Sequence, residues 1–324
     1  MAADQDKPQD NPHAARFSAL TRMLLDNVKR VGFPPIHTLP VERARDAYKA
    51  GVRASELPHA PLARVEDFHI PGSAGPIRAR LWANSHEPEQ PVLLYLHGGG
   101  FVIGSIETCE SMCRQIAVQS GAAVVAIDYR LAPEHKYPAG LQDCWAAFTW
   151  LVEHGRSMGL NGHRIAVGGD SAGGTLSAAV ALMARDAGIP LALQALVYPS
   201  VQTRVTTESF KAFSRDTLLS AELMNWFERQ TMGEQLDHDW HREPLYAPDH
   251  RGLAPAWIGL AECDALTDEG HQYAQKLREA VVPVEVREWP GVIHDFINMG
   301  RFLPEARELH HAMAAAVKHA LIDS

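Results

Sequence analysis

The stretch RIAVGGDSAGGTLSAAV, residues 164–180, decides the fold. It begins with an apolar run typical of a buried strand, and this run ends in Gly168 and Gly169. Asp170 and Ser171 come next, and a run of small residues with the character of a helix follows. A strand that turns directly into a helix is the repeating unit of α/β proteins. One serine therefore stands at such a turn, with glycines on both sides.

The five residues around this serine, G-D-S-A-G at 169–173, match the G-x-S-x-G pattern of a nucleophile elbow. In that turn the serine backbone is strained, and glycines are needed because side chains would collide with the adjacent strand and helix. The turn lifts the serine Oγ out of the sheet and directs a helix N-terminus at the reacting atoms. We therefore predict that Ser171 is a nucleophile; the alternative is a plain glycine-rich turn.

Two nucleotide-binding patterns can be tested on the same residues. A P-loop needs Gly-Lys-Ser or Gly-Lys-Thr, whereas this chain has Gly173, Gly174 and Thr175 without the lysine. The glycine run at 98–104 is one residue too long for the dinucleotide pattern G-x-G-x-x-G. Phosphate binding is expected at neither place, and no cofactor is predicted.

From about residue 64 onward, apolar runs of strand length alternate with helical patterns. The alternation predicts an α/β protein with a mostly parallel sheet of eight strands, flanked by helices. The first two strands are separated by a turn-rich segment and are expected to be antiparallel. The predicted strands are 64–70, 76–82, 91–98, 121–129, 164–169, 191–199, 255–263 and 282–289. The predicted helices are 107–119, 137–155, 171–187, 268–281 and one from about 304.

Two segments fall outside this alternation, and we expect them to pack together as a helical cap. Residues 1–54 carry amphipathic helices, and residues 201–250 carry a helix for which Ser220 is the predicted N-cap. The chain is therefore divided into a core of residues 55–200 and 251–324, with the cap contributed by the other two segments. The predicted buried face of the first helix consists of Phe17, Leu20, Leu24 and Val28.

Composition excludes several classes of protein. The formal net charge is −9 and there is no run of Lys and Arg, so nucleic acid is not an expected partner. No apolar run reaches the length of a membrane span, and the start of the chain lacks a secretory pattern, so a cytoplasmic location is expected. The 4 cysteines make no disulfide framework. Cys109 and Cys113 could form a redox pair, but reduced, half-buried thiols are the expectation.

The segment YLHGGGF, residues 95–101, follows the strand before the serine and is where esterases and lipases place an oxyanion loop. The N–H groups of Gly99 and Gly100, together with that of Ala172, could converge on a tetrahedral oxyanion. His97 is interpreted as a structural anchor of this loop rather than as the base, because the base comes last in the expected chain order.

The expected order is nucleophile, acid, histidine. Asp264 lies at the end of a predicted strand, where open α/β sheets place functional groups; Asp268 is the alternative, but suits the first turn of the next helix. Of 17 histidines, His294 is the one on the loop after the last strand. His310 and His311 fall in a helical pattern and are expected at the surface. The stretch DHDWH, residues 237–241, lacks a recognised ligand spacing, so no metal is predicted.

These motifs together resemble the hormone-sensitive-lipase-like family of α/β-hydrolase esterases, in its G-D-S-A-G branch. The blocks that carry the resemblance are HGGGF (97–101), DYRLAPEHKYPA (128–139), GDSAGG (169–174), DALTDEG (264–270) and IHDF (293–296). The resemblance implies an α/β-hydrolase fold with a helical cap. It also implies Ser171 as nucleophile, His294 as base and Asp264 as acid. The implied oxyanion donors are Gly99, Gly100 and Ala172.

Two positions depart from the family's usual pattern. Asp295 stands where glycine is common, and Ala265 stands where proline is common after the acid. Neither change removes a catalytic group. A carboxylate beside the base could raise the pKa of His294 or shape the rim of the pocket.

The expected activity is that of a serine carboxylesterase on short- to medium-chain acyl esters, working through an acyl-enzyme on small-molecule substrates. Trp226 and Phe227 in the cap could bound the acyl pocket, or could serve only to pack the cap. An amidase or lactonase with the same triad is the alternative, since the triad does not fix the leaving group. A silent ligand-binding protein, like the gibberellin-receptor relatives, is disfavoured because His294 is present. A homodimer through the strand at 283–290 or the last helix is possible.

Overall fold

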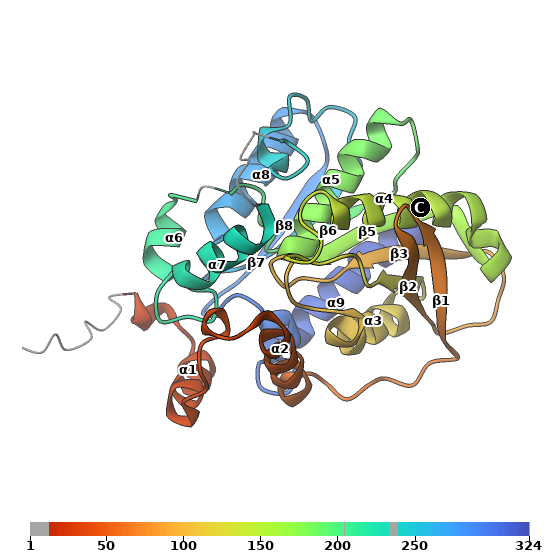
Figure 1. The fold of residues 1–324 in the computed structure, drawn as a ribbon. Coiled ribbons are helices and arrows are strands. Elements are labelled where there is room, and N and C mark those ends of the chain that lie inside the picture. Colours follow the sequence, from red (N-terminus) through yellow and green to blue (C-terminus); the bar gives the residue numbers. More distant parts are fainter. Residues whose placement is uncertain (1–12, 204, 233–238, 324) are drawn as a thin grey trace, which may run out of the picture.

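The structure, a computed structural model, describes residues 13–203, 205–232 and 239–323. At its centre lies one eight-stranded sheet in the order β1-β2-β4-β3-β5-β6-β7-β8 (Figure 1). β1 pairs antiparallel with β2, and β2 antiparallel with β4, whereas all the other pairs are parallel. The predicted eight-stranded, mostly parallel sheet is confirmed. The strands are β1 (Arg64–Gly72), β2 (Gly75–Ala83), β3 (Gln90–Leu96), β4 (Ala123–Ile127), β5 (Leu160–Asp170), β6 (Gln194–Val197), β7 (Ala256–Ala261) and β8 (Val284–Trp289).

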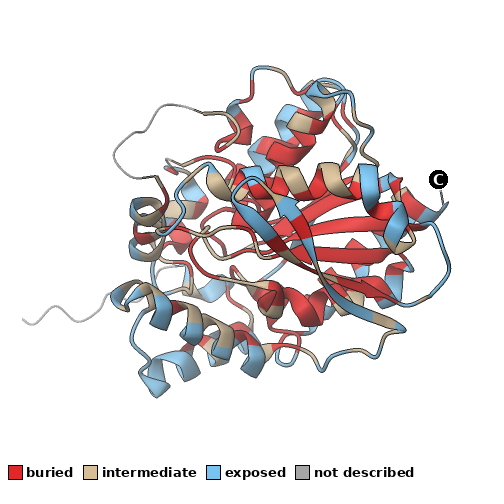
Figure 2. Cartoon of the chain, turned by 45° about the vertical axis from the view of Figure 1, so that its right-hand side comes forward, coloured by how far each residue is buried: buried red, intermediate tan, exposed pale blue. Residues whose placement is uncertain are grey.

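Helices cover both faces of this sheet (Figure 1). One face packs against α3 (Ile106–Ser120) and α9 (Pro304–Lys318). The other packs against α4 (Ala139–His154), α5 (Ala172–Asp186) and α8 (Thr267–Glu279). The central strands are therefore buried on both sides, as Figure 2 shows by their red colour. This explains why their sequences are almost continuous apolar runs rather than alternating ones.

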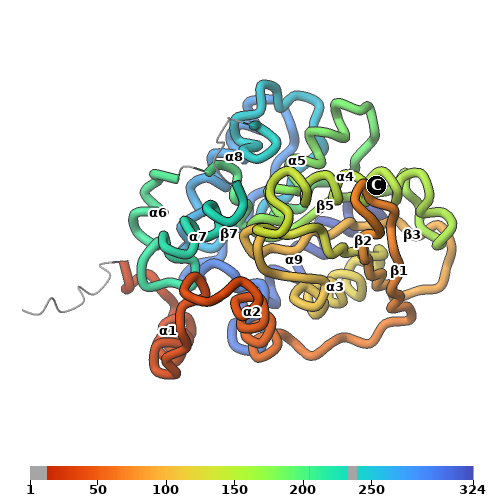
Figure 3. The backbone as a smooth tube through the Cα atoms, viewed as in Figure 1, coloured from red at the N-terminus to blue at the C-terminus, as the bar shows by residue number. Residues whose placement is uncertain are grey.

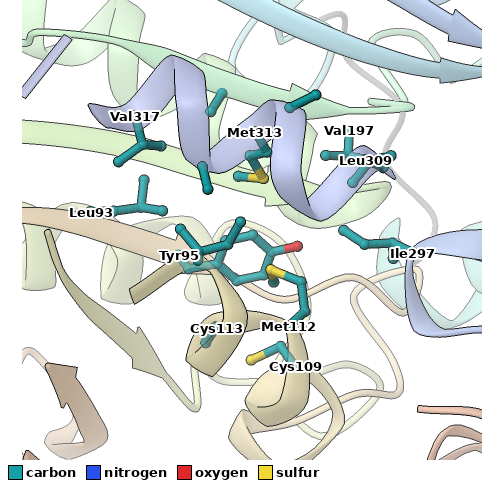
Figure 4. Close-up of a cluster of buried hydrophobic side chains, with 14 of the residues drawn as sticks. Leu93, Tyr95, Cys109, Met112, Cys113, Val197, Ile297, Leu309, Met313 and Val317 are labelled. Atoms are coloured by element: carbon teal, nitrogen blue, oxygen red, sulfur yellow. The ribbon is translucent and has the colours of Figure 1, made fainter. Parts of the chain in front are cut away.

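Tyr95 of β3 lies in the core between the sheet and the helix pair α3 and α9 (Figure 4). Its neighbours in this cluster include Met112 of α3 and Met313 of α9. Cys109 and Cys113 are part of the same cluster, and both are buried free thiols. Both thiols are thus more deeply buried than predicted, and their reduced state stays a prediction.

The two segments outside the alternation are in contact with one another. The N-terminal segment forms α1 (Ala19–Val31) and α2 (Val41–Ser55), and the insertion forms α6 (Glu208–Phe213) and α7 (Ala221–Met232). Figures 1 and 3 show these four helices grouped at one end of the sheet. Phe17 and Leu25 pack on Phe213, and α7 begins after Ser220, as predicted.

The predicted buried face of α1 was partly wrong. Leu20 and Val28 are 38% and 40% exposed, whereas Leu25, which lies further round the helix, is buried. Phe17 is buried but precedes the helix. The apolar arc of α1 is wider than the surface it covers, so periodicity alone could not indicate which part of the arc faces the protein.

β8 forms one edge of the sheet, as the dimer hypothesis assumes. Dimerisation itself stays a prediction. In the part of the chain that the structure describes, no helix combines the length and the apolar character that a membrane span requires.

Candidate active site

Ser171 stands at the sharp turn between β5 and α5. Its backbone has φ 53° and ψ −119°, a combination that residues with side chains rarely adopt. A Cβ atom on Gly169 would lie 2.4 Å from the carbonyl oxygen of Leu96, and one on Gly173 would lie 1.9 Å from it. The backbone of β3 therefore passes too close to the turn for side chains, which explains both glycines.

The three side chains predicted as nucleophile, base and acid form one hydrogen-bonded series. His294 Nε2 lies 3.0 Å from Ser171 Oγ, and His294 Nδ1 lies 2.6 Å from Asp264 Oδ2. Asp264 follows β7 and His294 follows β8, so the carboxyl ends of parallel strands bring the three together. Because Nδ1–H donates to the carboxylate, Nε2 is left to accept the Ser171 hydroxyl proton.

The loop after β3, residues 97–104, is called the glycine loop here. The carbonyl oxygen of Gly99 accepts hydrogen bonds from the N–H groups of Val102 (3.0 Å) and Ile103 (2.9 Å), which closes a tight turn. Within the described residues, the N–H groups of Gly99, Gly100 and Ala172 donate to no protein acceptor. These three donors are thus available to a ligand.

Residues 93–298, more than half of the chain, match the α/β-hydrolase fold family. Esterase LipI of Mycobacterium tuberculosis is 41% identical over 268 residues, which cover 79% of this chain and 83% of that protein. Ethyl acetate hydrolase of Pseudomonas putida is 38% identical over 220 residues, which cover 67% and 69%. A solved ester hydrolase from the Lake Arreo metagenome, in complex with a bipyridine phosphonate derivative, superposes with a TM-score of 0.90 at 38% identity, covering 93% of this chain and 98% of that one.

The chain belongs to the hormone-sensitive-lipase-like family of α/β hydrolases. It is a carboxylic ester hydrolase by class, as predicted from the motifs. The remaining features of this hydrolase concern what holds the site in place and what surrounds it.

Asp170, the residue before the serine, joins the strand end to the glycine loop. Its Oδ1 accepts a hydrogen bond from the Tyr95 hydroxyl at 2.6 Å and another from the Gly98 N–H at 3.0 Å. Burial raises the pKa of the Asp170 carboxyl, while these hydrogen bonds oppose the shift. Sequence reasoning missed this role. A charged residue at the end of an otherwise apolar strand was the available signal.

The surroundings of His294 favour its protonated form. Burial by itself lowers the pKa of the imidazole, but the charge and hydrogen bond of Asp264 outweigh it, and Asp295 and Asp170 add to the effect. The net result is a pKa above the ordinary value of histidine. An imidazolium at position 294 is thereby stabilised.

Helix α2 is fastened to the glycine loop by one arginine, which the sequence did not single out. Arg45 donates from Nε to the carbonyl oxygen of Val102 at 2.9 Å and from Nη2 to that of Ala132 at 3.0 Å. Its guanidinium also binds Glu134 in a two-point ion pair. The N-terminal segment therefore supports the loop that carries the free N–H groups.

Trp226 and Phe227 of α7 have different environments. Trp226 is buried in a cluster with Ala44 of α2 and with Val102 and Ile103 of the glycine loop. Phe227 is only partly buried, and a Cβ atom added to Gly100 would lie 2.2 Å from its ring. The structure thus places Trp226 inside the packing between α2, α7 and the loop, and Phe227 against the loop backbone itself.

His97 is held by its own loop and by Tyr129. Its Nδ1–H donates to the carbonyl oxygen of Gly98 at 2.8 Å, and its ring stacks on Tyr129 at 4.3 Å between centroids. Burial lowers the pKa of His97, which keeps the imidazole neutral. A cavity of about 340 Å³ has His97 and Tyr129 in its lining, but not Ser171, Asp264 or His294. This geometry suits an anchor of the loop rather than a base.

A second arginine that sequence reasoning missed lies beside the glycine loop. Arg242 of the insertion is buried, and its guanidinium carbon lies 4.5 Å from the centroid of the Phe101 ring. Its Nη2 donates to Glu228 of α7 at 2.9 Å. A cation–π contact and an ion pair thus join α7, the insertion and the loop.

The other residues that the sequence analysis considered, Asp268, His310, His311 and the described residues of the stretch 237–241, are not part of the hydrogen-bonded series at His294. Asp268 lies in the first turn of α8, as expected, and its Oδ2 accepts the Ser209 N–H at 2.8 Å. The prediction that His310 lies at the surface was wrong. The residue is 2% exposed, and its Nε2 donates to the carbonyl oxygen of Ile297 at 2.8 Å. His311 is exposed, as predicted. In the stretch 237–241, residues 237 and 238 lie outside the described part. Among the described residues, no group of three or more His, Cys, Asp or Glu could hold a metal ion.

Proposed function

We propose that this hydrolase is a serine carboxylesterase, in which Ser171 attacks the ester carbonyl and His294 and Asp264 activate it. The observation that carries the proposal is the pair of contacts at His294, 3.0 Å from Ser171 Oγ and 2.6 Å from Asp264 Oδ2. A nucleophile, its base and the group that orients the base are all within hydrogen-bond distance.

In the proposed reaction, His294 Nε2 takes the proton of Ser171 as Oγ forms a bond to the carbonyl carbon. Asp264 holds the imidazole in the required tautomer and stabilises its charge. His294 then gives the proton to the leaving alkoxide, which departs as the alcohol and leaves an acyl-enzyme. A water molecule, deprotonated by His294, attacks the acyl carbonyl carbon; His294 then returns this proton to Ser171 Oγ as the acyl C–O bond breaks and the carboxylic acid leaves. These residues suffice for the whole cycle, and the proposal includes no cofactor.

The oxyanion of each tetrahedral intermediate is assigned to the N–H groups of Gly99, Gly100 and Ala172. Their lack of protein acceptors supports the assignment, since a donor already engaged would have to break a hydrogen bond. Such donors are most effective where the protein holds them fixed. The contacts of Asp170 and Arg45 with the glycine loop, described above, provide that rigidity.

The substrate is proposed to be a small-molecule ester with a short- to medium-chain acyl group, bound beneath a cap made of residues 1–54 and 201–250. The nearness of Phe227 to Gly100 supports a short acyl pocket, because a bulky ring leaves little space beside the proposed oxyanion donor. The likeness to a relative named ethyl acetate hydrolase supports the same size class.

The test is hydrolysis of p-nitrophenyl esters from acetate to palmitate by the wild type and by Ser171→Ala. We expect rates that peak at short acyl chains and a loss of at least about a thousandfold in the variant. Ser157→Ala, which changes an exposed serine, is the matched control. A fluorophosphonate probe should label Ser171, as peptide mass spectrometry would show. Near-wild-type activity in Ser171→Ala, or labelling elsewhere, would overturn the proposal.

The same assay separates the amidase or lactonase alternative. Anilides and lactones matched to the best ester would be compared with it under identical conditions. Faster turnover of an amide or a lactone would leave the proposed triad in place and change the substrate class.

A further inference from the structure

Asp295 directly follows His294 and has a left-handed backbone with φ 68°. Residues with a side chain are disfavoured by about 1 kcal/mol in this conformation, and glycine is preferred. The carboxylate is partly buried, and its Oδ1 accepts hydrogen bonds from the Tyr48 hydroxyl at 3.2 Å and from Asn298 Nδ2 at 2.7 Å. Aspartate at this position therefore makes contacts that glycine could not.

We propose that Asp295 is a positioning residue with two effects: it fastens the loop of His294 to helix α2, and it places a second negative charge beside the His294 imidazole. The inference rests on the proposed function, because it concerns the base of that reaction.

The first effect follows from where the partners of Asp295 come from. Tyr48 lies on α2, whose Arg45 also holds the glycine loop at Val102, so one helix contacts both the loop that carries proposed oxyanion donors and the loop of the proposed base. Asn298 ends the short 3-10 helix η5 (Phe296–Asn298), and its backbone N–H donates to the Asp295 carbonyl oxygen at 3.0 Å. The carboxylate is thus fixed on its own loop and on α2.

The second effect follows from the ionisable groups around the carboxylate. Burial and the charge of Asp170 raise the pKa of Asp295 to about 7, while His294 opposes the rise. Asp295 in turn contributes, after Asp264, to the raised pKa of His294. The other ionisable groups near it are Tyr48 and Tyr198, and burial raises the pKa of both phenols, so both stay neutral.

The two groups consequently titrate together. A negative Asp295 favours the imidazolium, and protonation of Asp295 makes the imidazolium less favourable, so the protons bind in two overlapping steps. The reaction needs a neutral His294, and activity falls as pH decreases through these steps. Without the carboxylate charge, His294 should bind its proton in one step and at lower pH.

The experiment measures kcat/KM against pH from 4 to 9 on the best ester. Asp295→Asn removes the charge and keeps an oxygen acceptor for Tyr48. Tyr48→Phe removes the tether and keeps the charge. Asp216→Asn, which removes a carboxylate from the insertion, controls for the change in net charge.

We expect the acid limb of Asp295→Asn to move about 0.5–1 pH unit lower and to narrow to one ionisation, because one nearby charge is lost. Tyr48→Phe should move the limb less than Asp295→Asn does, because the carboxylate remains and loses only one of the hydrogen bonds that favour its charged form, and it should raise KM or lower kcat several-fold. An Asp295→Asn limb that coincides with that of the wild type and of Asp216→Asn overturns the charge effect. Wild-type values of kcat and KM in Tyr48→Phe would overturn the proposal that Tyr48 tethers the loop of His294.

A readout without turnover distinguishes this inference from the proposed function. The imidazole resonance of His294, assigned by its loss in His294→Gln, is titrated by NMR in the wild type and in Asp295→Asn. A lower pKa of His294 in the variant supports the inference even if no ester is hydrolysed. An unchanged pKa contradicts it even if the protein is an active esterase.

Discussion

Phe227 lies so close to Gly100 that a Cβ atom added to this glycine would come 2.2 Å from Cγ of the ring. The ring belongs to the insertion, and the glycine belongs to the loop proposed to bind the oxyanion. Neither can move toward the other. The size of residue 100 and the position of α7 are therefore coupled, and substitutions on either side should affect catalysis.

Gly100→Ala should abolish most of the activity. Gly100 has φ 58°, so the added methyl group meets both backbone strain and the Phe227 ring. Displacing one oxyanion donor should reduce kcat on the order of a hundredfold or more. Gly121→Ala is the control, because Gly121 has φ 78° but no atom within 4 Å of its Cβ position. It should lose about 1 kcal/mol of stability and keep its kcat. A Gly100→Ala enzyme with wild-type kcat would show that this N–H group is not used.

Phe227→Ala and Trp226→Ala should have separable effects on chain-length preference and on stability. Removal of the Phe227 ring opens space beside Gly100, so the optimum on p-nitrophenyl esters should move to longer acyl chains. Trp226 is buried among α2 and the glycine loop, so its truncation should cost about 3–5 kcal/mol in unfolding free energy. An unchanged chain-length profile in both variants would assign the two aromatic residues to packing alone.

Tyr95→Phe should destabilise the protein by about 1.5–3 kcal/mol, because the Asp170 carboxyl loses a buried hydrogen-bond donor. Tyr198→Phe is a matched control: the Tyr198 hydroxyl is also buried, but among the described residues it has no hydrogen-bond partner. Its removal should change stability by less than about 0.5 kcal/mol. Urea unfolding of both variants measures the difference. Equal losses of unfolding free energy in the two variants would mean that the contact between Tyr95 and Asp170 adds nothing to stability.

His310 should make the protein less stable as pH falls from about 6.5 to 4. Burial lowers its pKa to about 4, whereas an unfolded histidine titrates near 6.5. Between these values the unfolded state binds more protons, so the unfolding free energy decreases as the pH falls, by up to about 3 kcal/mol in total. His310→Gln should flatten the profile of stability against pH over this range. His311→Gln changes the exposed neighbour and should leave the slope of stability against pH as in the wild type. If His311→Gln flattened the profile as much as His310→Gln, the pH effect could not be assigned to His310.

The strands and the grouping of the proposed triad could be predicted because each depends on local signals. Apolar runs mark strands that are buried on both sides, and Ser171 and Asp264 each follow such a run, whereas His294 follows the alternating edge strand β8. In a parallel sheet the carboxyl ends of the strands lie at the same edge, so no other signal is needed to predict that the three residues lie together.

Contacts between distant segments could not be predicted in this way. Tyr48 meets Asp295 across 247 positions, and nothing in either segment specifies the other. His310 was misplaced for a related reason. Its helix contacts α3, the sheet and the loop around Ile297, so more than one face of α9 is covered. A helical pattern shows which face is apolar, but not how many neighbours the helix has.

The contacts of the N-terminal segment have a consequence for the order of folding. Arg16 pairs with Glu262 across 246 positions, and the Ser18 N–H donates to the carbonyl oxygen of Gly291. Ribosomes make the N-terminal part first, and contacts across such distances carry the largest loop-closure cost. Phe17 and helix α1, which pack in a cluster with Cys263 and Ile293, must therefore wait on the nascent chain, their apolar side chains uncovered, until β7 and β8 have been synthesised and added to the sheet. The part of the molecule that is made first is thus among the last to be secured.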